Sequence, residues 1–220
     1  MKNFKSRYFY IIGLIGAILL LSGCAQSKGA SFPVGQEDLQ KAIDKHQLGW
    51  SVVREIAEDH EFSKGGYGKA FHLEKDGRSL GVLTTIQKDE MRVITLVLFG
   101  RPRTEAGETF ENVPKENWRE VLLFLGEIYG SEQYTDQAYE KMMSYYEKNK
   151  TEDTKTLLFS EEYDGTHYNT LFTEKMTITH TSGDSKPEEI TITYDDQASI
   201  NISNKAGNDF YLNGIKDYQF

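Results

Sequence analysis

The side chain with the most distinctive chemical context in this sequence is the thiol of Cys24, the only cysteine among 220 residues. Leu21, Ser22 and Gly23 stand directly before it, and an uncharged apolar run that begins at Tyr8 precedes them. The start of the chain carries three basic residues, Lys2, Lys5 and Arg7. A basic start, an apolar run and small residues before a cleavage point are typical of an export signal. The apolar run is shorter than the roughly 20 residues that a membrane-spanning helix needs, so we expect a cleaved leader.

The segment from Leu21 to Cys24 resembles the lipobox of bacterial lipoproteins, in which a leucine and two small residues precede a cysteine. The resemblance implies cleavage between Gly23 and Cys24, leaving residues 1–23 as a signal peptide. It also implies transfer of a diacylglyceryl group to the Cys24 thiol. Such a lipid anchors a protein to the cell membrane stably, whereas one acyl chain binds only marginally. We therefore expect a lipid-anchored protein on the extracytoplasmic side of the cell membrane.

The charge of the exported chain limits its partners. Removal of residues 1–23 takes away three basic residues and no acidic residue, and so changes the formal net charge from −9 to −12. Nucleic acids need an excess of lysine and arginine, so this charge excludes them as partners. The negative charge also makes it unfavourable for the folded part of the chain to lie flat on anionic lipid. Because no cysteine remains for a disulfide, the fold must depend on an ordinary hydrophobic core.

Other residues that support catalysis or metal binding fall into no recognised pattern. The chain has no His-Glu-x-x-His and no Gly-x-Ser-x-Gly motif. None of the histidines forms a pair at metal-ligand spacing; they are His46, His60, His72, His167 and His180. Three acidic pairs occur, Glu161-Glu162, Glu188-Glu189 and Asp195-Asp196. Neighbours on a strand point to opposite faces, so such pairs do not predict an acid and a base. We predict no catalytic residue, metal or cofactor.

Aromatic residues are the remaining candidates for binding. The chain contains 13 tyrosines and 12 phenylalanines, and aromatic rings supply contact area in protein and glycan recognition. We select Trp50, which opens an expected strand, and Tyr145, which lies off the apolar face of its expected helix. Core packing is the alternative role for both. An envelope protein or a glycan is the expected kind of partner.

The first half of the exported chain is predicted to form one helix and a meander of strands. Residues 24–35 are small and polar and are expected to form a flexible tether. Apolar spacing predicts a helix over residues 36–47, followed by alternating strand residues from Trp50. The Asp76-Gly77 pair predicts a tight hairpin, and Arg92 to Phe99 predicts a buried central strand. We assign residues 36–100 to this unit and residues 101–113 to a linker.

The second half repeats this order over residues 114–220. Helices are predicted over residues 118–129 and 135–149, and Asp164-Gly165 predicts another hairpin. Strands are expected around residues 157–163, 167–172, 176–180 and 190–194. Residues 205–208 are expected to form a turn between short strands at 200–202 and 210–212. The fold class is therefore α+β, with antiparallel meanders packed against helices and with two similar helix-plus-meander units.

Three segments carry a second resemblance. Leu48 to Val52, Phe71 to Gly81 and Trp118 to Tyr129 are similar to a pattern in uncharacterised lipoproteins of Firmicutes. The element order also resembles, in architecture alone, the tandem repeats of β-lactamase-inhibitor-like proteins, and a shared architecture does not imply a shared function. We therefore predict a non-catalytic binding or interaction module at the cell envelope. The alternatives are an envelope hydrolase whose carboxylates converge only in the fold, and a structural or assembly lipoprotein.

Overall fold

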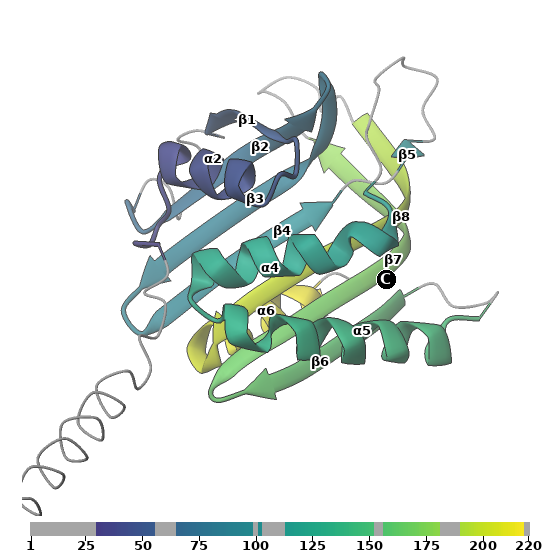
Figure 1. The fold of residues 1–220 in the computed structure, drawn as a ribbon. Helices are drawn as coiled ribbons and strands as arrows, with labels where there is room; N and C mark the ends of the chain where they lie inside the picture. The colour runs from purple at the N-terminus through teal and green to yellow at the C-terminus, as the bar shows by residue number, and fades with distance from the viewer. Residues whose placement is uncertain are drawn as a thin grey trace, which may run out of the picture.

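The computed structural model describes residues 30–55, 65–98, 101–102, 113–151, 156–180 and 190–217 (Figure 1). The lipobox, Cys24 and residues 24–29 of the expected tether lie outside these residues. Within the described ranges no helix is both long enough and apolar enough to span a bilayer.

One antiparallel sheet forms the centre of the molecule, and its strands follow the order β1-β2-β3-β4-β8-β7-β6. The first four strands are β1 (Ser51–Glu55), β2 (Gly68–Lys75), β3 (Arg78–Lys88) and β4 (Met91–Leu98). The others are β6 (Thr156–Tyr163), β7 (Thr166–His180) and β8 (Ile190–Asn204), with the short β5 (Arg101–Pro102) paired to β8. The two edges of this order are therefore β1 and β6.

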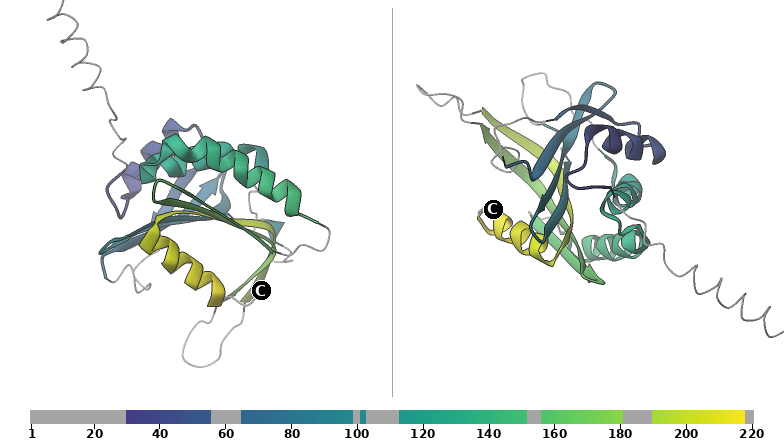
Figure 2. Two further views of the ribbon diagram at one scale, coloured as in Figure 1. Left: turned by 90° about the horizontal axis from the view of Figure 1, so that it is seen from below. Right: turned by 90° about the vertical axis from the view of Figure 1, so that its left-hand side faces the viewer.

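Helices cover the two faces of the sheet unequally. Three of them, α2 (Gln36–Lys45), α4 (Trp118–Tyr129) and α5 (Thr135–Asn149), lie on one face, whereas α6 (Lys205–Asp217) lies on the other (Figure 2). The short 3₁₀ turns η1 (Lys115–Asn117) and η2 (Glu132–Tyr134) lead into α4 and α5. The three-helix face holds the main hydrophobic core, in which Phe71, Leu83 and Leu96 occupy one cross-strand row.

The two predicted helix-plus-meander units meet in the middle of the sheet. The last strand of the first unit, β4, pairs with the last strand of the second unit, β8, from Val93↔Ser203 to Leu98↔Ala198. Both sets contribute to the same core cluster, in which Trp118 stacks on Phe172 with ring centroids 5.5 Å apart. The α+β class predicted from the sequence is confirmed.

The two predicted Asp-Gly turns and the predicted helix over residues 118–129 are also present. At the β2–β3 hairpin Asp76 and Gly77 both adopt positive φ, and Asp164 and Gly165 do the same between β6 and β7. An Asp-Gly pair tolerates this backbone geometry, which a tight two-residue hairpin requires. The helix predicted over residues 118–129 ends where Gly130 adopts φ of 90°. A left-handed glycine is a common helix terminator.

The prediction for residues 205–212 is wrong, because the turn and final short strand are the helix α6. Asn204 explains where the helix starts, since its Oδ1 accepts a hydrogen bond from the Gly207 backbone N–H at 3.0 Å. Gly207 lies directly against the sheet. A Cβ there would stand 2.6 Å from Val93 Cγ2 and 2.7 Å from the Arg92 carbonyl oxygen. The glycine that suggested a turn is therefore what allows the helix to approach β4 closely.

Candidate functional site

A groove between α5 and the edge strand β6 is the site best suited to binding. The helix and the strand lie side by side at the border of the sheet (Figure 1). The groove has a volume of about 690 Å³ and is lined from α5 by Glu140, Lys141, Ser144, Tyr145, Lys148 and Asn149. From β6 it is lined by Leu158, Phe159, Ser160 and Glu161. Tyr145, one of the two residues selected from the sequence, thus lies in it.

Helical periodicity determines which α5 side chains reach the groove. Lys141, Tyr145 and Lys148 are four and three residues apart, so they follow one another along one face of the helix. Met142 and Tyr146 lie on the buried side of α5 and belong to the core. Tyr145 is half-buried, and its ring centroid lies 5.9 Å from that of Phe159. Phe159 is 4 % exposed and belongs to the core, so the half-buried ring of Tyr145 supplies the apolar surface that the groove exposes.

One ion pair crosses the groove. Lys141 Nζ lies 2.9 Å from Glu161 Oε2, and the hydrogen bond with Glu161 raises the pKa of Lys141 above its usual value. The same ammonium lies 5.3 Å from the Tyr163 ring centroid, within cation–π range. Lys148 makes no ion pair with any residue in the described ranges. The groove therefore holds charges of both signs beside an aromatic pair.

The backbone of β6 is the second feature of this site. Within the described ranges β6 pairs with β7 alone, from Thr156↔Thr173 to Tyr163↔Thr166. The residues that flank a two-residue hairpin loop form a hydrogen-bonded pair, and such pairs alternate along the ladder. Counted from Tyr163, the backbone groups of Glu162, Ser160 and Leu158 therefore point away from β7. They form a row of donors and acceptors at the groove that no described residue hydrogen-bonds.

Trp50, the other residue selected from the sequence, lies near the opposite edge of the sheet, next to β1. Its side chain is 5 % exposed, packs edge-to-face on Phe124 with centroids 5.9 Å apart and belongs to the main core. It reaches only the margin of a small hollow that His46 and Pro114 also line. The structure does not bring Trp50 and Tyr145 together, because they lie near opposite edges of the sheet.

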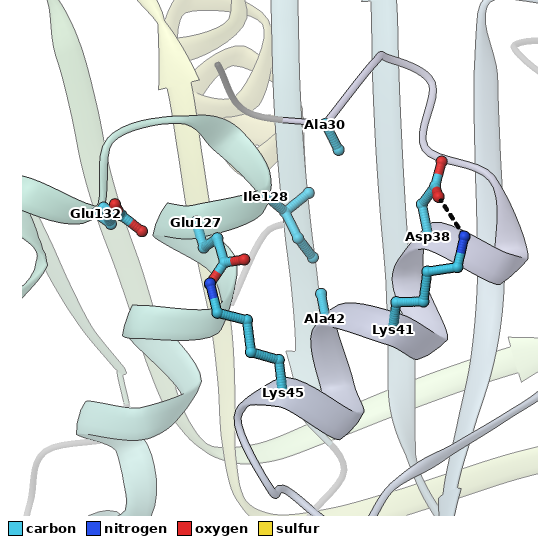
Figure 3. Close-up of a pocket in the computed structure, with 8 residues that line it drawn as sticks. All are labelled: Ala30, Asp38, Lys41, Ala42, Lys45, Glu127, Ile128 and Glu132. Atoms are coloured by element: carbon cyan, nitrogen blue, oxygen red, sulfur yellow. Dashed lines mark hydrogen bonds and ion pairs between the residues drawn. The ribbon is translucent and has the colours of Figure 1, made fainter. Parts of the chain in front are cut away.

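A second pocket lies between α2 and α4 and contains carboxylates from three elements. Asp38, Glu127 and Glu132 line it together with Lys41 and Lys45 (Figure 3). Lys45 Nζ lies 2.7 Å from Glu127 Oε2, and Lys41 Nζ lies 3.3 Å from Asp38 Oδ1. This is the kind of convergence that the hydrolase alternative requires.

The ionisation of Glu127 does not suit a general acid in that pocket. Burial raises its pKa, but hydrogen bonds with Lys45 and His46 outweigh burial and leave the pKa below its usual value. His46 Nε2 lies 2.8 Å from the same carboxylate oxygen. A catalytic acid needs a raised pKa near the working pH. These contacts therefore indicate that Glu127 holds α2 against α4 and does not act as a catalytic acid.

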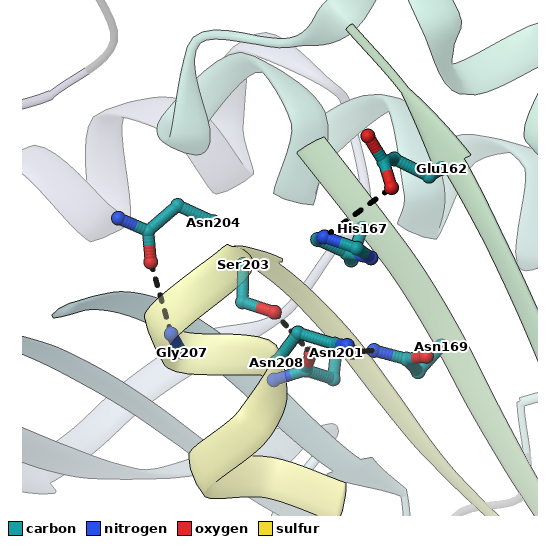
Figure 4. A network of polar contacts seen from close by, with 8 residues as sticks. All are labelled: Glu162, His167, Asn169, Asn201, Ser203, Asn204, Gly207 and Asn208. Carbon is teal, nitrogen blue, oxygen red and sulfur yellow. Dashed lines mark hydrogen bonds and ion pairs between the residues drawn. The ribbon is translucent and has the colours of Figure 1, made fainter. Parts of the chain in front are cut away.

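A polar network lies under α6, on the other face of the sheet (Figure 4). His167 faces Ser203 across β7 and β8, and its Nε2 lies 3.7 Å from Glu162 Oε2. Ser203 is fully buried, and its hydroxyl donates to Asn201 Oδ1 at 2.9 Å. A serine nucleophile must instead donate to its base and be open to substrate. Asn169 of β7 donates to Asn208 Oδ1 of α6 at 2.8 Å, so the network has a structural role and joins β7, β8 and α6.

The remaining sequence candidates are dispersed. Glu161 and Glu162 point to opposite faces of β6, toward Lys141 and His167, as the strand alternation predicts. His72 hydrogen-bonds Ser79 at 2.7 Å, far from the other described histidines. No group of three or more potential metal ligands occurs among the described residues. His60 and Glu188-Glu189 lie outside the described residues, as do the side chains of His180 and Asp195-Asp196.

Sequence reasoning selected one residue of the groove and missed the rest. Lys141 and Lys148 flank Tyr145 on the same helical face, a signal that periodicity contains. No local pattern shows that this face lies beside β6, because that contact depends on the strand order. No known protein family, curated protein or solved structure matches this chain.

Proposed function

We propose that this chain is a lipid-anchored extracytoplasmic protein that acts as a non-catalytic interaction module and binds a protein partner in the α5–β6 groove. The groove beside an open strand edge is the observation that carries the proposal. Its surface combines the ring of Tyr145, charges of both signs and backbone groups that no described residue hydrogen-bonds. Polypeptides present all three complementary features, whereas a small substrate is usually enclosed in a deeper and more apolar pocket.

The attachment of the N-terminal segment supports this proposal. Ala30 donates its backbone N–H to the Ile128 carbonyl at 3.0 Å and accepts a hydrogen bond from Arg92 Nη2 at 3.3 Å. The Arg92 guanidinium lies against the rings of both Phe32 and Tyr129, 4.3 and 4.8 Å from their centroids. These contacts fix the point at which the tether joins the folded body.

The position of that point supports a groove that is accessible to a partner beyond the membrane surface. The chain from Cys24 to Ala30 extends at most about 20 Å, so the end of the body that holds Ala30 stays close to the bilayer. Ala30 and Glu132 line the same α2–α4 pocket, and α5 starts just after Glu132. From there α5 runs for about 20 Å. Its last turns, with Tyr145 and Lys148, thus lie toward the far end from the anchor, where a partner has access.

Site-specific photo-cross-linking in intact cells tests the proposal. We would replace Tyr145 with a photoreactive phenylalanine analogue and, as a matched control, place the same analogue at Val53, which is 46 % exposed on β1. A defined protein adduct from position 145 and none from position 53 is expected. Equal adducts from both positions, or none from either, would contradict a partner site in the groove.

Membrane attachment needs its own test. A Cys24→Ser variant of the full chain should lose its lipid and leave the membrane fraction. Photo-cross-linking from position 145 in the same variant then shows whether the groove binds its partner without membrane attachment. Processed Cys24→Ser protein that stays in the membrane fraction would contradict the anchor.

A further inference from the structure

The open backbone edge of β6 indicates how the groove binds its partner. We infer that binding occurs by strand addition: an extended partner segment that carries lysine or arginine pairs with β6 and becomes the next strand of the sheet. The inference depends on the proposed function, because it specifies the chemistry of the same groove.

The first argument is the length and composition of β6. The strand has eight residues, no proline and no lysine, and its pairing with β7 shows no register shift. Natural edge strands are commonly shortened, bulged, covered or given lysine or proline to prevent pairing with other chains. β6 is neither short nor bulged and has no lysine or proline; Glu161 and Glu162 are its two charged residues, and no described strand pairs with its outer side. A long regular edge is the surface that main-chain recognition of an extended peptide requires.

The second argument is the position of the outward backbone groups. Those of Leu158 and Ser160 belong to residues that line the groove, so a strand added there lies alongside α5. Alternate side chains of the added strand then point toward the half-buried ring of Tyr145, against which an apolar residue packs. The others lie beside Leu158 and Glu162, whose side chains are 37 % and 58 % exposed.

The third argument is charge, which selects the kind of segment. The two charged residues of β6 are Glu161 and Glu162, and the expected exported chain has a net charge of −12. Pairing with a second copy of β6 would bring four carboxylates together without any basic residue from either strand. A segment with lysine or arginine instead gains complementary charge opposite Glu162.

Peptide binding to the purified full exported chain tests this mode. The probe is a synthetic peptide of about the length of β6, in which lysine alternates with valine and phenylalanine. A peptide with glutamate in place of lysine is the control. Fluorescence anisotropy should show the basic peptide binding at least about tenfold more tightly than the acidic one. Equal affinity for the two peptides would overturn the charge selection.

A proline variant tests the backbone contact. Ser160→Pro removes an outward N–H without removing a hydrogen bond to β7, and an edge strand tolerates this change. It should weaken peptide binding about tenfold or more, whereas Ser160→Ala keeps the N–H and should bind as the parent chain does. Equal affinity of the two variants would overturn strand addition.

Amide hydrogen exchange provides a readout that does not depend on the folding of the proline variant. Bound peptide should slow exchange at Leu158, Ser160 and Glu162 and leave Phe159 and Glu161 unchanged. Protection without this alternation would overturn strand addition. A concentration-dependent homodimer that Ser160→Pro abolishes would identify a second copy of the chain as the occupant. It would overturn the inference that the partner segment is basic.

Failure of this inference differs from failure of the proposed function. If photo-cross-links still form from position 145 and survive the Ser160→Pro change, the groove binds a partner by side-chain contacts and only strand addition is wrong. If position 145 gives no adduct while the peptides also fail to bind, both proposals are wrong.

Discussion

The two edges of the sheet have their backbone groups satisfied in different ways. At β1, the side chain of Gln40 accepts the Val52 N–H at 2.9 Å and donates to the Trp50 carbonyl at 3.2 Å. Gln36 donates to the Val52 carbonyl at 3.3 Å. Two glutamines of α2 thus take the place of a neighbouring strand. At β6, α5 lies beside the edge and supplies the Lys141–Glu161 ion pair, but no described side chain hydrogen-bonds its outward backbone groups.

This difference shows that a nearby helix does not by itself close an edge. β1 has five residues and a register shift between Val52 and Arg54, and it is closed by specific amide side chains. β6 is longer and regular, and its outer side pairs with no described strand. Natural proteins usually protect edges because open ones pair with other chains. The protected edge therefore acts as an internal reference for the one that we assign to partner binding.

The largest expected effect comes from removing the packing that holds α2 on β1. Leu39 is fully buried, and Leu39→Ala should lower the free energy of unfolding by about 2–5 kcal/mol, since it leaves a cavity in the core. Urea unfolding measures the loss. Leu158→Ala, on the exposed side of β6, is the matched control and should cost less than about 1 kcal/mol. Similar losses for the two variants would contradict the contrast between the edges.

A smaller effect is expected from removing the glutamine contact alone. Gln40→Ala leaves the Val52 N–H and the Trp50 carbonyl without their described partner, at a cost of about 1–3 kcal/mol. Amide exchange at Val52 should accelerate in the same variant. Gln137→Ala, an exposed change on α5, should alter stability by less than about 0.5 kcal/mol. Unchanged exchange at Val52 would show that Gln40 does not protect the β1 edge.

The smallest effect is expected at Glu127, which fastens the end of α2 to α4 through Lys45 and His46. Folding lowers the pKa of Glu127, so its ionised form stabilises the fold above the unfolded-state pKa of about 4.3. This contribution is lost as the pH falls through the lower folded-state pKa. Glu127→Gln should therefore reduce stability near neutral pH by less than about 1 kcal/mol.

The pH dependence of that variant separates electrostatic from packing effects. Thermal unfolding from about pH 7 to about pH 3 should show a difference between parent and Glu127→Gln that shrinks on acidification. A difference that stays constant over this range would mean that the carboxylate charge does not hold α2 in place.

Much of the fold could be predicted because its signals are local. Asp-Gly pairs determine the hairpins at Gly77 and Gly165, and apolar spacing determines the helix from Trp118 to Tyr129. The helix α6 could not be predicted in the same way. Gly207 suggests a turn when it is considered locally, but its lack of a side chain serves a contact with Val93 and Arg92 on a strand more than 100 residues earlier.

The candidate site was predictable to a smaller extent. Tyr145 could be selected because it lies off the apolar face of its helix. Lys141 and Phe159 line the same groove only because β6 is placed at the border of the sheet, beside α5. Trp50 has the same aromatic character as a binding residue, yet its burial depends on Phe124 of α4. Residue type alone cannot distinguish these two environments.

The sequence by itself determined the periodicity of the helices, the positions of the two Asp-Gly hairpins, the acidic charge and the expectation of a lipid anchor at Cys24. Each of these depends on residues that are close together in the chain. Only the tertiary structure decided that β4 pairs with β8, that α2 closes the β1 edge and that β6 lies beside Tyr145 with no described strand on its outer side. The physical reason is that the pairing of strands and the closing of edges depend on contacts between residues distant in sequence, which local patterns do not specify.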